Sequence, residues 1–243
     1  MRRALAALVL ACAFPAYSDS SCVSSERSSS LGEIVARVHA GEVKYVFVGE
    51  RHGVGPVKKF AVDLANALVE SGEDVGLYVE GFRTDCPPRD GSCWSLARAF
   101  NGEAFRTLLD ESKASIHPID PPERDRRTAR MAARIAKGRE AVRVVLVGKS
   151  HVVYAGDHEA EHWVYGGGLR FPDPGDLAEA FPRQEVLTIG LETSEEGVPS
   201  YALRLGGCGV DYVVTTEPTR DYWGTVESTG IAKNEGPAAT SLR

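Results

Sequence analysis

Apolar residues along this chain follow two periods, and segments of the two kinds alternate. Short β-branched or aromatic runs indicate strands buried on both faces, at residues 44–49, 74–82, 115–120 and 141–148. Apolar residues at helical spacing indicate helices at residues 30–41, 56–72, 92–114 (with a break at Gly102) and 121–139. Strands that alternate with helices of this length are typical of a parallel sheet with right-handed crossovers.

The pattern changes toward the C-terminus. A short helix is expected at residues 173–182, and strands are expected at residues 185–192, 200–206 and 211–218. The segments between these strands are too short for crossover helices, so we expect an antiparallel extension. The sequence thus predicts a single α/β domain over residues 31–225, with a mainly parallel mixed sheet, helices on both faces and an antiparallel extension near the C-terminus.

Both ends of the chain differ from this domain. Residues 1–18 combine two arginines, a short apolar run and small residues before Ser18, which is typical of a signal peptide cleaved after Ser18. Cys12 lies in a poor lipobox, so lipoprotein anchoring is the second interpretation. Serine-rich residues 19–30 are expected to form a flexible leader, and residues 226–243 a disordered tail. We therefore expect an exported protein, either periplasmic or secreted.

Cleavage of that peptide would leave Cys22, Cys86, Cys93 and Cys208. An even number of cysteines in an exported chain indicates disulfides, and three pairings are possible. The tight loop CPPRDGSC favours a bond between Cys86 and Cys93, with Cys22 and Cys208 joining the two ends of the domain. The chain has no C-x-x-C pair, which argues against a tetrathiolate metal site.

The composition is acidic, with 34 Asp and Glu against 28 Lys and Arg and a net charge of −6. This balance argues against nucleic acid or an anionic membrane surface as the main partner. No segment after the N-terminal run approaches the roughly 20 apolar residues that a membrane helix needs, so no transmembrane segment is expected. A small molecule or a peptide remains the expected partner.

Polar side chains that can carry chemistry follow four of the predicted strands. The stretch YVFVGERH at residues 45–52 returns in altered form as VVLVGKSH at residues 144–151, each a strand followed by glycine, two polar residues and histidine. The groups at the four strand ends are Glu50 with His52, Glu80, Asp120, and His151. Because ligands gather beyond the carboxyl ends of parallel strands, we expect these side chains to converge on one cavity.

A single G-x-x-H after a strand would mean little, because glycine turns with polar residues are common at strand ends. Two copies at corresponding strand ends, with Glu50 directly after the first glycine, favour a functional site. Glu80 follows an apolar run and would be costly to bury alone. It therefore requires a partner, such as a metal, His52, Arg51 or Arg83.

The motif G-E-x-H after a buried strand, followed by a strand ending in Glu80 and a late G-x-x-H, resembles the superfamily of erythromycin esterases, ChaN-like haem-binding lipoproteins, and TraB and Tiki proteins. The resemblance spans residues 43–190. By this resemblance, His52 would be the catalytic base of the esterases or a metal ligand as in the Tiki-like proteases. Glu50, Glu80 and His151 would match other motif positions, whereas Asp120 follows only the general strand-end pattern.

The resemblance implies two functions of different classes. The first is an exported hydrolase of the erythromycin-esterase or Tiki type that cleaves an ester or peptide bond, with His52, Glu50, Glu80 and His151 as catalytic residues. If a divalent metal assists, His52, His151 and Glu80 would hold it. The second is a ChaN-like haem-binding or iron-uptake protein without catalysis, in which His151 or Tyr154 could ligate the haem iron.

Other residues are assigned to the pocket wall or to packing. Substrate contacts are expected from Asp120, Arg83, Trp163 and Tyr165. The segment HEAEH at residues 158–162 matches the zinc motif H-E-x-x-H, but its flanks leave room for at most about two helical turns, which favours a solvated loop or an ancillary pocket wall. The arginines of the helix at 121–139 are expected on a solvated face, although Arg124 or Arg127 could bind a substrate carboxylate. His117 is compatible with either pocket or core.

Overall fold

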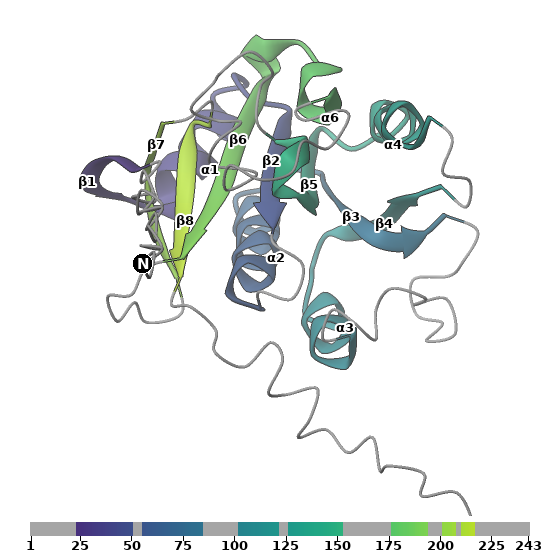
Figure 1. Ribbon diagram of the computed structural model, residues 1–243, viewed down its shortest axis with the longest axis horizontal. Helices are drawn as coiled ribbons and strands as arrows, with labels where there is room; N and C mark the ends of the chain where they lie inside the picture. Colours follow the sequence, from purple (N-terminus) through teal and green to yellow (C-terminus); the bar gives the residue numbers. More distant parts are fainter. Residues whose placement is uncertain are drawn as a thin grey trace, which may run out of the picture.

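The computed structural model describes residues 23–50, 55–84, 102–121, 126–152, 176–193, 201–207 and 210–216. Within these ranges the chain forms one eight-stranded sheet in the order β1-β7-β8-β6-β2-β5-β3-β4 (Figure 1). The strands are β1 (Val23–Ser29), β2 (Tyr45–Glu50), β3 (Val75–Arg83), β4 (Ser115–Asp120), β5 (Val142–Gly148), β6 (Val186–Thr193), β7 (Ala202–Gly206) and β8 (Tyr212–Thr216). The helices are α1 (Leu31–His39), α2 (Gly55–Glu70), α3 (Gly102–Asp110), α4 (Arg127–Ala136) and α6 (Asp176–Glu179), with 3₁₀ turns η3 (Lys149–His151) and η4 (Arg183–Glu185).

Parallel pairing dominates the sheet, which confirms the predicted fold class. β2 lies between β5 and β6, and β3 lies between β5 and β4, with every one of these pairs parallel. The connections between these strands contain α2, α3 and α4, as parallel crossovers require. The carboxyl ends of β2, β5, β3 and β4 therefore lie side by side at the same end of the strands.

The antiparallel extension is present near the C-terminus, but it is narrower than the three strands expected there. β7 is antiparallel to β8 and to β1. β6 and β8, in contrast, are parallel to each other, and β6 is parallel to β2. β7 itself returns the chain between β6 and β8, so these two strands can be parallel without a helix between them.

Part of the serine-rich segment forms a strand, which corrects the expectation of a flexible leader over residues 19–30. Residues 23–29 form β1, with Val23 opposite Gly206 and Ser29 opposite Leu203. Low apolar content predicted disorder because such a segment can bury little surface. An edge strand such as β7 offers unpaired backbone groups instead, and serine can pair with these through its own backbone.

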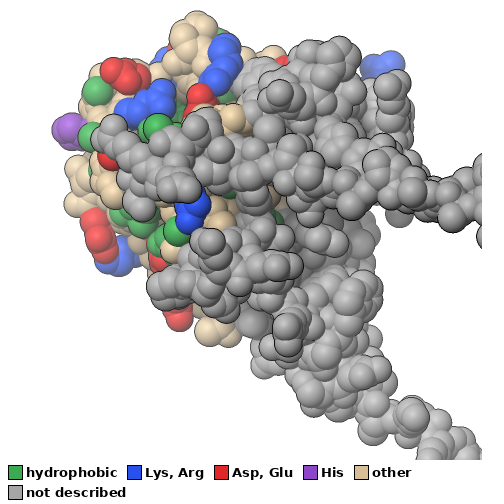
Figure 2. Space-filling view, turned by 60° about the vertical axis from the view of Figure 1, so that its left-hand side comes forward, with side chains coloured by type: hydrophobic (Ala, Val, Ile, Leu, Met, Phe, Trp, Pro, Cys, Tyr) green, Lys and Arg blue, Asp and Glu red, His purple; other side chains and the backbone are tan. Residues whose placement is uncertain are grey.

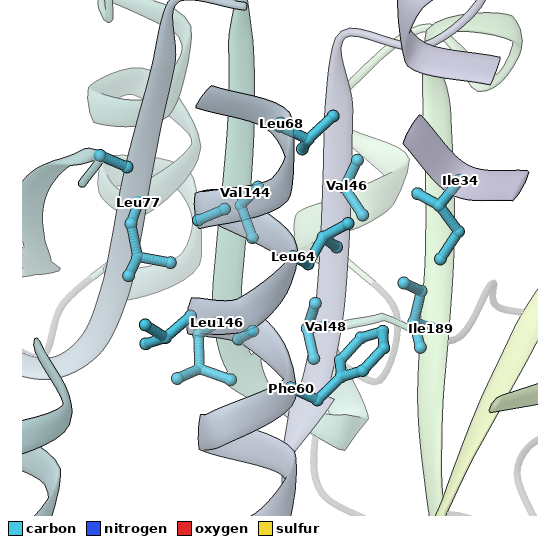
Figure 3. Packing of buried hydrophobic residues seen from close by; sticks show 14 of the residues in the cluster. Ile34, Val46, Val48, Phe60, Leu64, Leu68, Leu77, Val144, Leu146 and Ile189 are labelled. Carbon is cyan, nitrogen blue, oxygen red and sulfur yellow. The ribbon is translucent and has the colours of Figure 1, made fainter. Parts of the chain in front are cut away.

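Two apolar cores lie on opposite faces of the sheet. One joins the sheet to α1, α2 and α3, and Figure 3 shows Phe60, Leu64 and Leu68 of α2 packed near β2 and β5. The other joins the sheet to α4 and α6. Because successive side chains of a strand point to opposite faces, Val48 of β2 belongs to the first core and Phe47 to the second. Each fully buried side chain of this size contributes about 1.5–3 kcal/mol.

The helices begin and end where short-range chemistry favours it. Ser30 caps α1, because its hydroxyl accepts a hydrogen bond from the N–H of Glu33 at 3.3 Å. Gly41 and Gly72, which follow α1 and α2, have φ values of 76° and 97°, a region that glycine adopts without strain. α4 starts at Arg127, later than the proline pair from which the sequence predicted it.

The surface of the described residues carries both signs of charge. In the view of Figure 2, acidic and basic side chains are interspersed over this part of the molecule. No helix among the described residues is both long and apolar enough to span a bilayer.

Candidate active site

Three of the predicted site residues lie together at the carboxyl end of the sheet. Glu80 is in β3, Asp120 is the last residue of β4, and His151 ends the 3₁₀ turn that follows β5. Because β3 lies between β5 and β4, Glu80 is central among them. Glu80 and Asp120 are buried, and His151 is partly buried.

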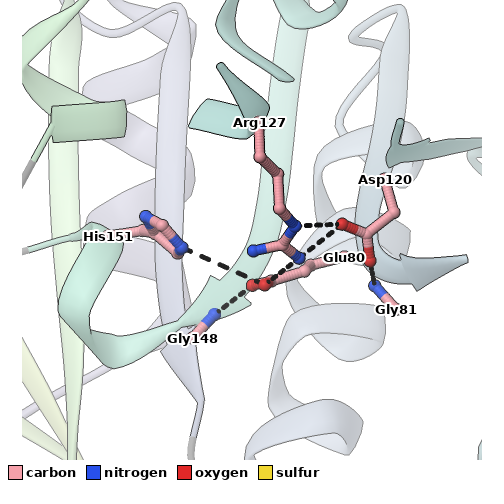
Figure 4. Close-up of polar contacts among 6 residues, drawn as sticks. All are labelled: Glu80, Gly81, Asp120, Arg127, Gly148 and His151. Atoms are coloured by element: carbon pink, nitrogen blue, oxygen red, sulfur yellow. Dashed lines mark hydrogen bonds and ion pairs between the residues drawn. The ribbon is translucent and has the colours of Figure 1, made fainter. Parts of the chain in front are cut away.

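Arg127, the first residue of α4, joins the two carboxylates (Figure 4). Its Nε donates to Oδ1 of Asp120 at 2.7 Å, and its Nη2 donates to Oε1 of Glu80 at 2.5 Å. Nη2 also forms an ion pair with Asp120. One guanidinium therefore bridges two strand ends, a fork-shaped contact that only arginine can make.

Backbone N–H groups complete the hydrogen bonding of both carboxylates. The N–H of Gly148, in the last position of β5, donates to Oε2 of Glu80 at 2.6 Å. The N–H of Gly81 donates to Oδ2 of Asp120 at 2.6 Å. Gly81 has a φ of 91°, which glycine adopts readily, and the N–H of Thr84 bonds the carbonyl of Asp120 nearby. Each of the four carboxylate oxygens therefore accepts a bond from the protein.

The electrostatics of the cluster separate its two carboxyl groups. Burial acts to raise the pKa of Glu80, but the charges of His151 and Arg127 and the N–H of Gly148 outweigh it and hold that pKa below its ordinary value. Burial raises the pKa of Asp120 above its ordinary value, because Arg127 offsets only part of the combined effect of burial and the Glu80 charge. Such a separation is typical of acid–base sites.

The two carboxylates also act on Arg127. Burial acts to lower its pKa, but Glu80 and Asp120 raise it above its ordinary value, so the guanidinium stays charged. His151 places Nε2 4.0 Å from Oε1 of Glu80. This distance is an ion-pair contact rather than a hydrogen bond, and such contacts often shorten when a substrate binds.

Glu50 lies at the same edge of the sheet but on the opposite face. Val48, two residues earlier, belongs to the core under α2, whereas Tyr78, two residues before Glu80, belongs to the core under α4. In agreement with this, Glu50 Oε2 lies 3.5 Å from Nζ of Lys58 in α2. The expected single cavity containing both glutamates is therefore not formed by their side chains.

The other predicted residues are not placed. His52, Trp163 and Tyr165 lie outside the described residues, as do Arg51, Arg124 and the HEAEH segment. The same holds for the signal peptide, for Cys12, Cys22, Cys86, Cys93 and Cys208, for Tyr154, and for the C-terminal tail. Arg83 ends β3, and its backbone pairs with Asp120, but its side chain is outside the described part of the structure.

The predicted metal set of His52, His151 and Glu80 includes one residue, His52, that lies outside the described part of the structure. Within the described part of the chain, no group of three His, Cys, Asp or Glu is placed to hold a metal ion. Arg127 supplies a positive charge between Glu80 and Asp120. The charged partner that a buried Glu80 requires is therefore Arg127, the first residue of α4.

His117 belongs to a second polar cluster, on the same face of the sheet. Its Nε2 is 2.6 Å from Oε1 of Glu140, and its ring stacks on Tyr78 with centroids 4.6 Å apart. The hydroxyl of Tyr78 donates to Oε2 of Glu140 at 2.7 Å. These contacts place His117 away from the carboxyl-end cluster, because Tyr78 precedes Glu80 in β3 and Glu140 precedes β5.

Comparison with known proteins adds two distant likenesses in fold. No family model and no curated protein matches the chain. Two solved structures do: the type III effector HopBA1 (13% identity, 77% of this chain, 93% of that chain, TM-score 0.42) and ChaN of Campylobacter jejuni, described with cofacial haem binding (10% identity, 77% and 92%, TM-score 0.47). At these identities the likeness concerns the fold alone. The described residues themselves form an α/β fold with an ionic cluster at the carboxyl end of the sheet.

Proposed function

We propose that the protein is a hydrolase that cleaves an ester or peptide bond by acid–base catalysis. The observation that supports this most is the contact between the buried Glu80 carboxylate and His151, at the edge of a parallel sheet where ligands bind. Burying two carboxylates beside an arginine is costly, so such a cluster is weak evidence for stability and stronger evidence for a site.

In this proposal His151 accepts a proton from water, which then attacks the acyl carbon of the substrate. The imidazolium that forms faces Glu80, whose negative charge stabilises it. Arg127 and the N–H of Gly148 fix Glu80, so the carboxylate orients His151 and does not itself react. Asp120 holds Arg127 from the other side.

The remaining roles rest on the sequence. His52 comes two residues after the end of β2 in the sequence, and we keep it as a second catalytic imidazole in the proposal. Glu50 would hold the end of β2, near His52 in the sequence, through its contact with Lys58. Arg83, Trp163 and Tyr165 stay proposed substrate contacts.

The test is a panel of acyl substrates: aryl esters, alkyl esters, a lactone and short peptides. Wild-type protein is expected to hydrolyse at least one class. Glu80→Gln, which keeps the shape but removes the charge that faces His151, is expected to lower kcat by roughly 10²–10⁴-fold. Absence of hydrolysis across the panel, or full activity in Glu80→Gln, would contradict the proposal.

Haem binding is the second candidate function. It needs an imidazole or phenolate that faces an apolar slot. His151 lies at the appropriate edge, but its Nε2 faces Glu80, which favours the acid–base role. Titration with haemin decides between the two: a Soret shift that His151→Ala abolishes would favour haem binding, and an unchanged spectrum would exclude it.

Export of the protein and its two disulfides are proposed from the sequence alone. Cys22 and Cys208 lie outside the described residues, and their pairing rests on the even number of cysteines in an exported chain. Peptide mass spectrometry of protein purified without reductant is expected to yield linked Cys22 and Cys208 peptides and a linked Cys86 and Cys93 peptide. Detection of free thiols at all four positions would contradict both pairings.

A further inference from the structure

We propose that Arg127 is a catalytic residue that donates a hydrogen bond, through Nη1, to the carbonyl oxygen of the scissile acyl group. It would thereby stabilise the oxyanion that develops when water attacks. This inference rests on the proposed hydrolysis, and it assigns to Arg127 a role beyond holding the two carboxylates.

The first observation is which guanidinium nitrogens are engaged. Nε and Nη2 bond Asp120 and Glu80, whereas no described residue accepts a hydrogen bond from Nη1. Figure 4 shows this third nitrogen turned toward the side on which His151 lies. A substrate oxygen bound to Nη1 would therefore be on the same side of Glu80 as the imidazole.

The second observation is exposure. The side chain of Arg127 is 32% exposed, whereas those of Glu80 and Asp120 are 5% and 8% exposed. The cluster thus buries its carboxylates and leaves part of the arginine accessible. The exposed part of the Arg127 side chain is the part of this cluster that a ligand could contact.

The third observation is rigidity. Bonds from Nε and Nη2 to two different strands fix the plane of the guanidinium, so the direction of the Nη1 N–H groups is set before substrate binds. A donor fixed in advance stabilises a developing charge without reorganisation, which is the main requirement of an oxyanion site. Lysine has a single nitrogen and cannot make all of these contacts at once.

The charge balance selects the chemical class of the ligand. Two carboxylates face one guanidinium, so with His151 neutral the cluster carries no net positive charge when both carboxylates are ionised. A free carboxylate or phosphate would meet Glu80 and Asp120 behind Arg127, which disfavours an anion. A neutral carbonyl oxygen meets no such repulsion, and it becomes negative only when His151 becomes positive. The site therefore fits a neutral acyl group.

The step balances in atoms and charge. His151 takes one proton of the water, the water oxygen forms a bond to the acyl carbon, and the carbonyl π electrons move to the oxygen bound by Nη1. Collapse of this intermediate restores the carbonyl and expels the alcohol or amine, which takes the proton from the imidazolium. The products are the carboxylic acid and the leaving alcohol or amine.

The test is steady-state kinetics of Arg127→Lys on the best substrate of the panel, with folding checked by circular dichroism and thermal unfolding. We expect kcat to fall about 10²–10³-fold and KM to change little, because the bond forms mainly in the transition state. Arg134→Lys is the matched control: Arg134 lies in the same helix and donates to the carbonyl of Pro118 at 2.7 Å. It is expected to keep kcat within about twofold.

The pH profile separates this role from a structural one. If Arg127 acted only by fixing Glu80, Arg127→Lys would move the limb of the profile that reports His151, and that result would overturn the inference. A pH profile of Arg127→Lys in which the plateau of kcat is lowered and the limb that reports His151 is unmoved supports the inference. If Arg127→Lys unfolds, Arg127→Gln is judged by kcat alone, because loss of the charge beside Glu80 would move the His151 limb whatever the role of Nη1. Unchanged kcat in a folded Arg127 variant, with activity still lost in Glu80→Gln, overturns the inference and leaves the proposed function standing. A wild-type protein without hydrolysis overturns both.

Discussion

Two buried glutamates at the same edge of the sheet meet their cations in different ways. Glu50 is paired with Lys58, and both are nearly inaccessible, at 5% and 3% exposure. The Lys58 ammonium also lies 5.0 Å from the ring centre of Phe105. Glu80 is paired with Arg127, which is partly exposed and has His151 on the same side. The first arrangement is closed and the second is open, so only the second offers donors to a ligand.

This contrast depends on which helix covers each face. α2 covers the face to which Glu50 points, and it supplies Lys58 from its first turns. α4 covers the other face and supplies Arg127 from its first position, at the edge of the sheet. A cation one turn further along α4 would be carried away from the edge, because the helix rises 1.5 Å per residue.

The closed pair can be broken by Lys58→Met. This change leaves Glu50 buried without its cation and is expected to lower the free energy of unfolding by about 3–5 kcal/mol. The double variant Glu50→Leu/Lys58→Met is expected to recover most of that loss, since apolar pairs often replace buried ion pairs without cost. Urea denaturation monitored by circular dichroism measures both. If Lys58→Met were as stable as wild type, the contact between Glu50 and Lys58 would not be a buried ion pair.

The open cluster should be visible in the pH dependence of stability. The pKa of Glu80 is lower in the folded state than its ordinary value of 4.5. Its contribution to stability is therefore present above pH 4.5 and lost as pH falls through the folded pKa. Glu80→Gln is expected to flatten this acid limb in urea midpoints measured between about pH 3 and pH 7.

Asp120 acts in the opposite direction and partly masks that limb. Its pKa is raised in the folded state, so its contribution is present below its ordinary value of 3.8 and lost as pH rises through the folded pKa. Asp120→Asn is therefore expected to steepen the rise of stability with pH. Equal pH dependence in Glu80→Gln, Asp120→Asn and wild type would mean that the cluster is not held as described.

The smallest effect is expected at the contact between His117 and Glu140. The His117 side chain is 32% exposed, and partly exposed ion pairs contribute about 0–1 kcal/mol. His117→Gln should therefore change the free energy of unfolding by less than about 1 kcal/mol, measured by the same denaturation. A larger loss would mean that its stacking on Tyr78 matters more than the ion pair.

Much of the fold follows from the periodic pattern alone. Short runs that are apolar on both faces and alternate with helices predict a parallel sheet. The strands β2, β3, β4 and β5 are present as expected. β1 could not be predicted, because its pairing depends on backbone groups at the β7 edge rather than on apolar side chains. The position of β8 next to β6 could not be predicted either, because it depends on β7, which returns the chain between these two parallel strands.

The site was only partly predictable. Glu80, Asp120 and His151 follow from their places after strands. The face that Glu50 occupies does not, because strands apolar on both faces give no sign of which helix covers which side. Arg127 was expected on a solvated helix face, and its partners depend on where α4 begins. A buried glutamate with an arginine opening the helix after the next strand is the signal that could have identified it.

The proposed hydrolysis assigns the role of catalytic base to His151, at the carboxyl end of the sheet, and not to His117, which lies beside Glu140. The most direct test compares kcat of His151→Asn with that of His117→Gln on the same substrate. We expect His151→Asn to lose at least about 100-fold and His117→Gln to stay within about twofold of wild type. Equal activity in the two variants, or a greater loss in His117→Gln, would contradict the account.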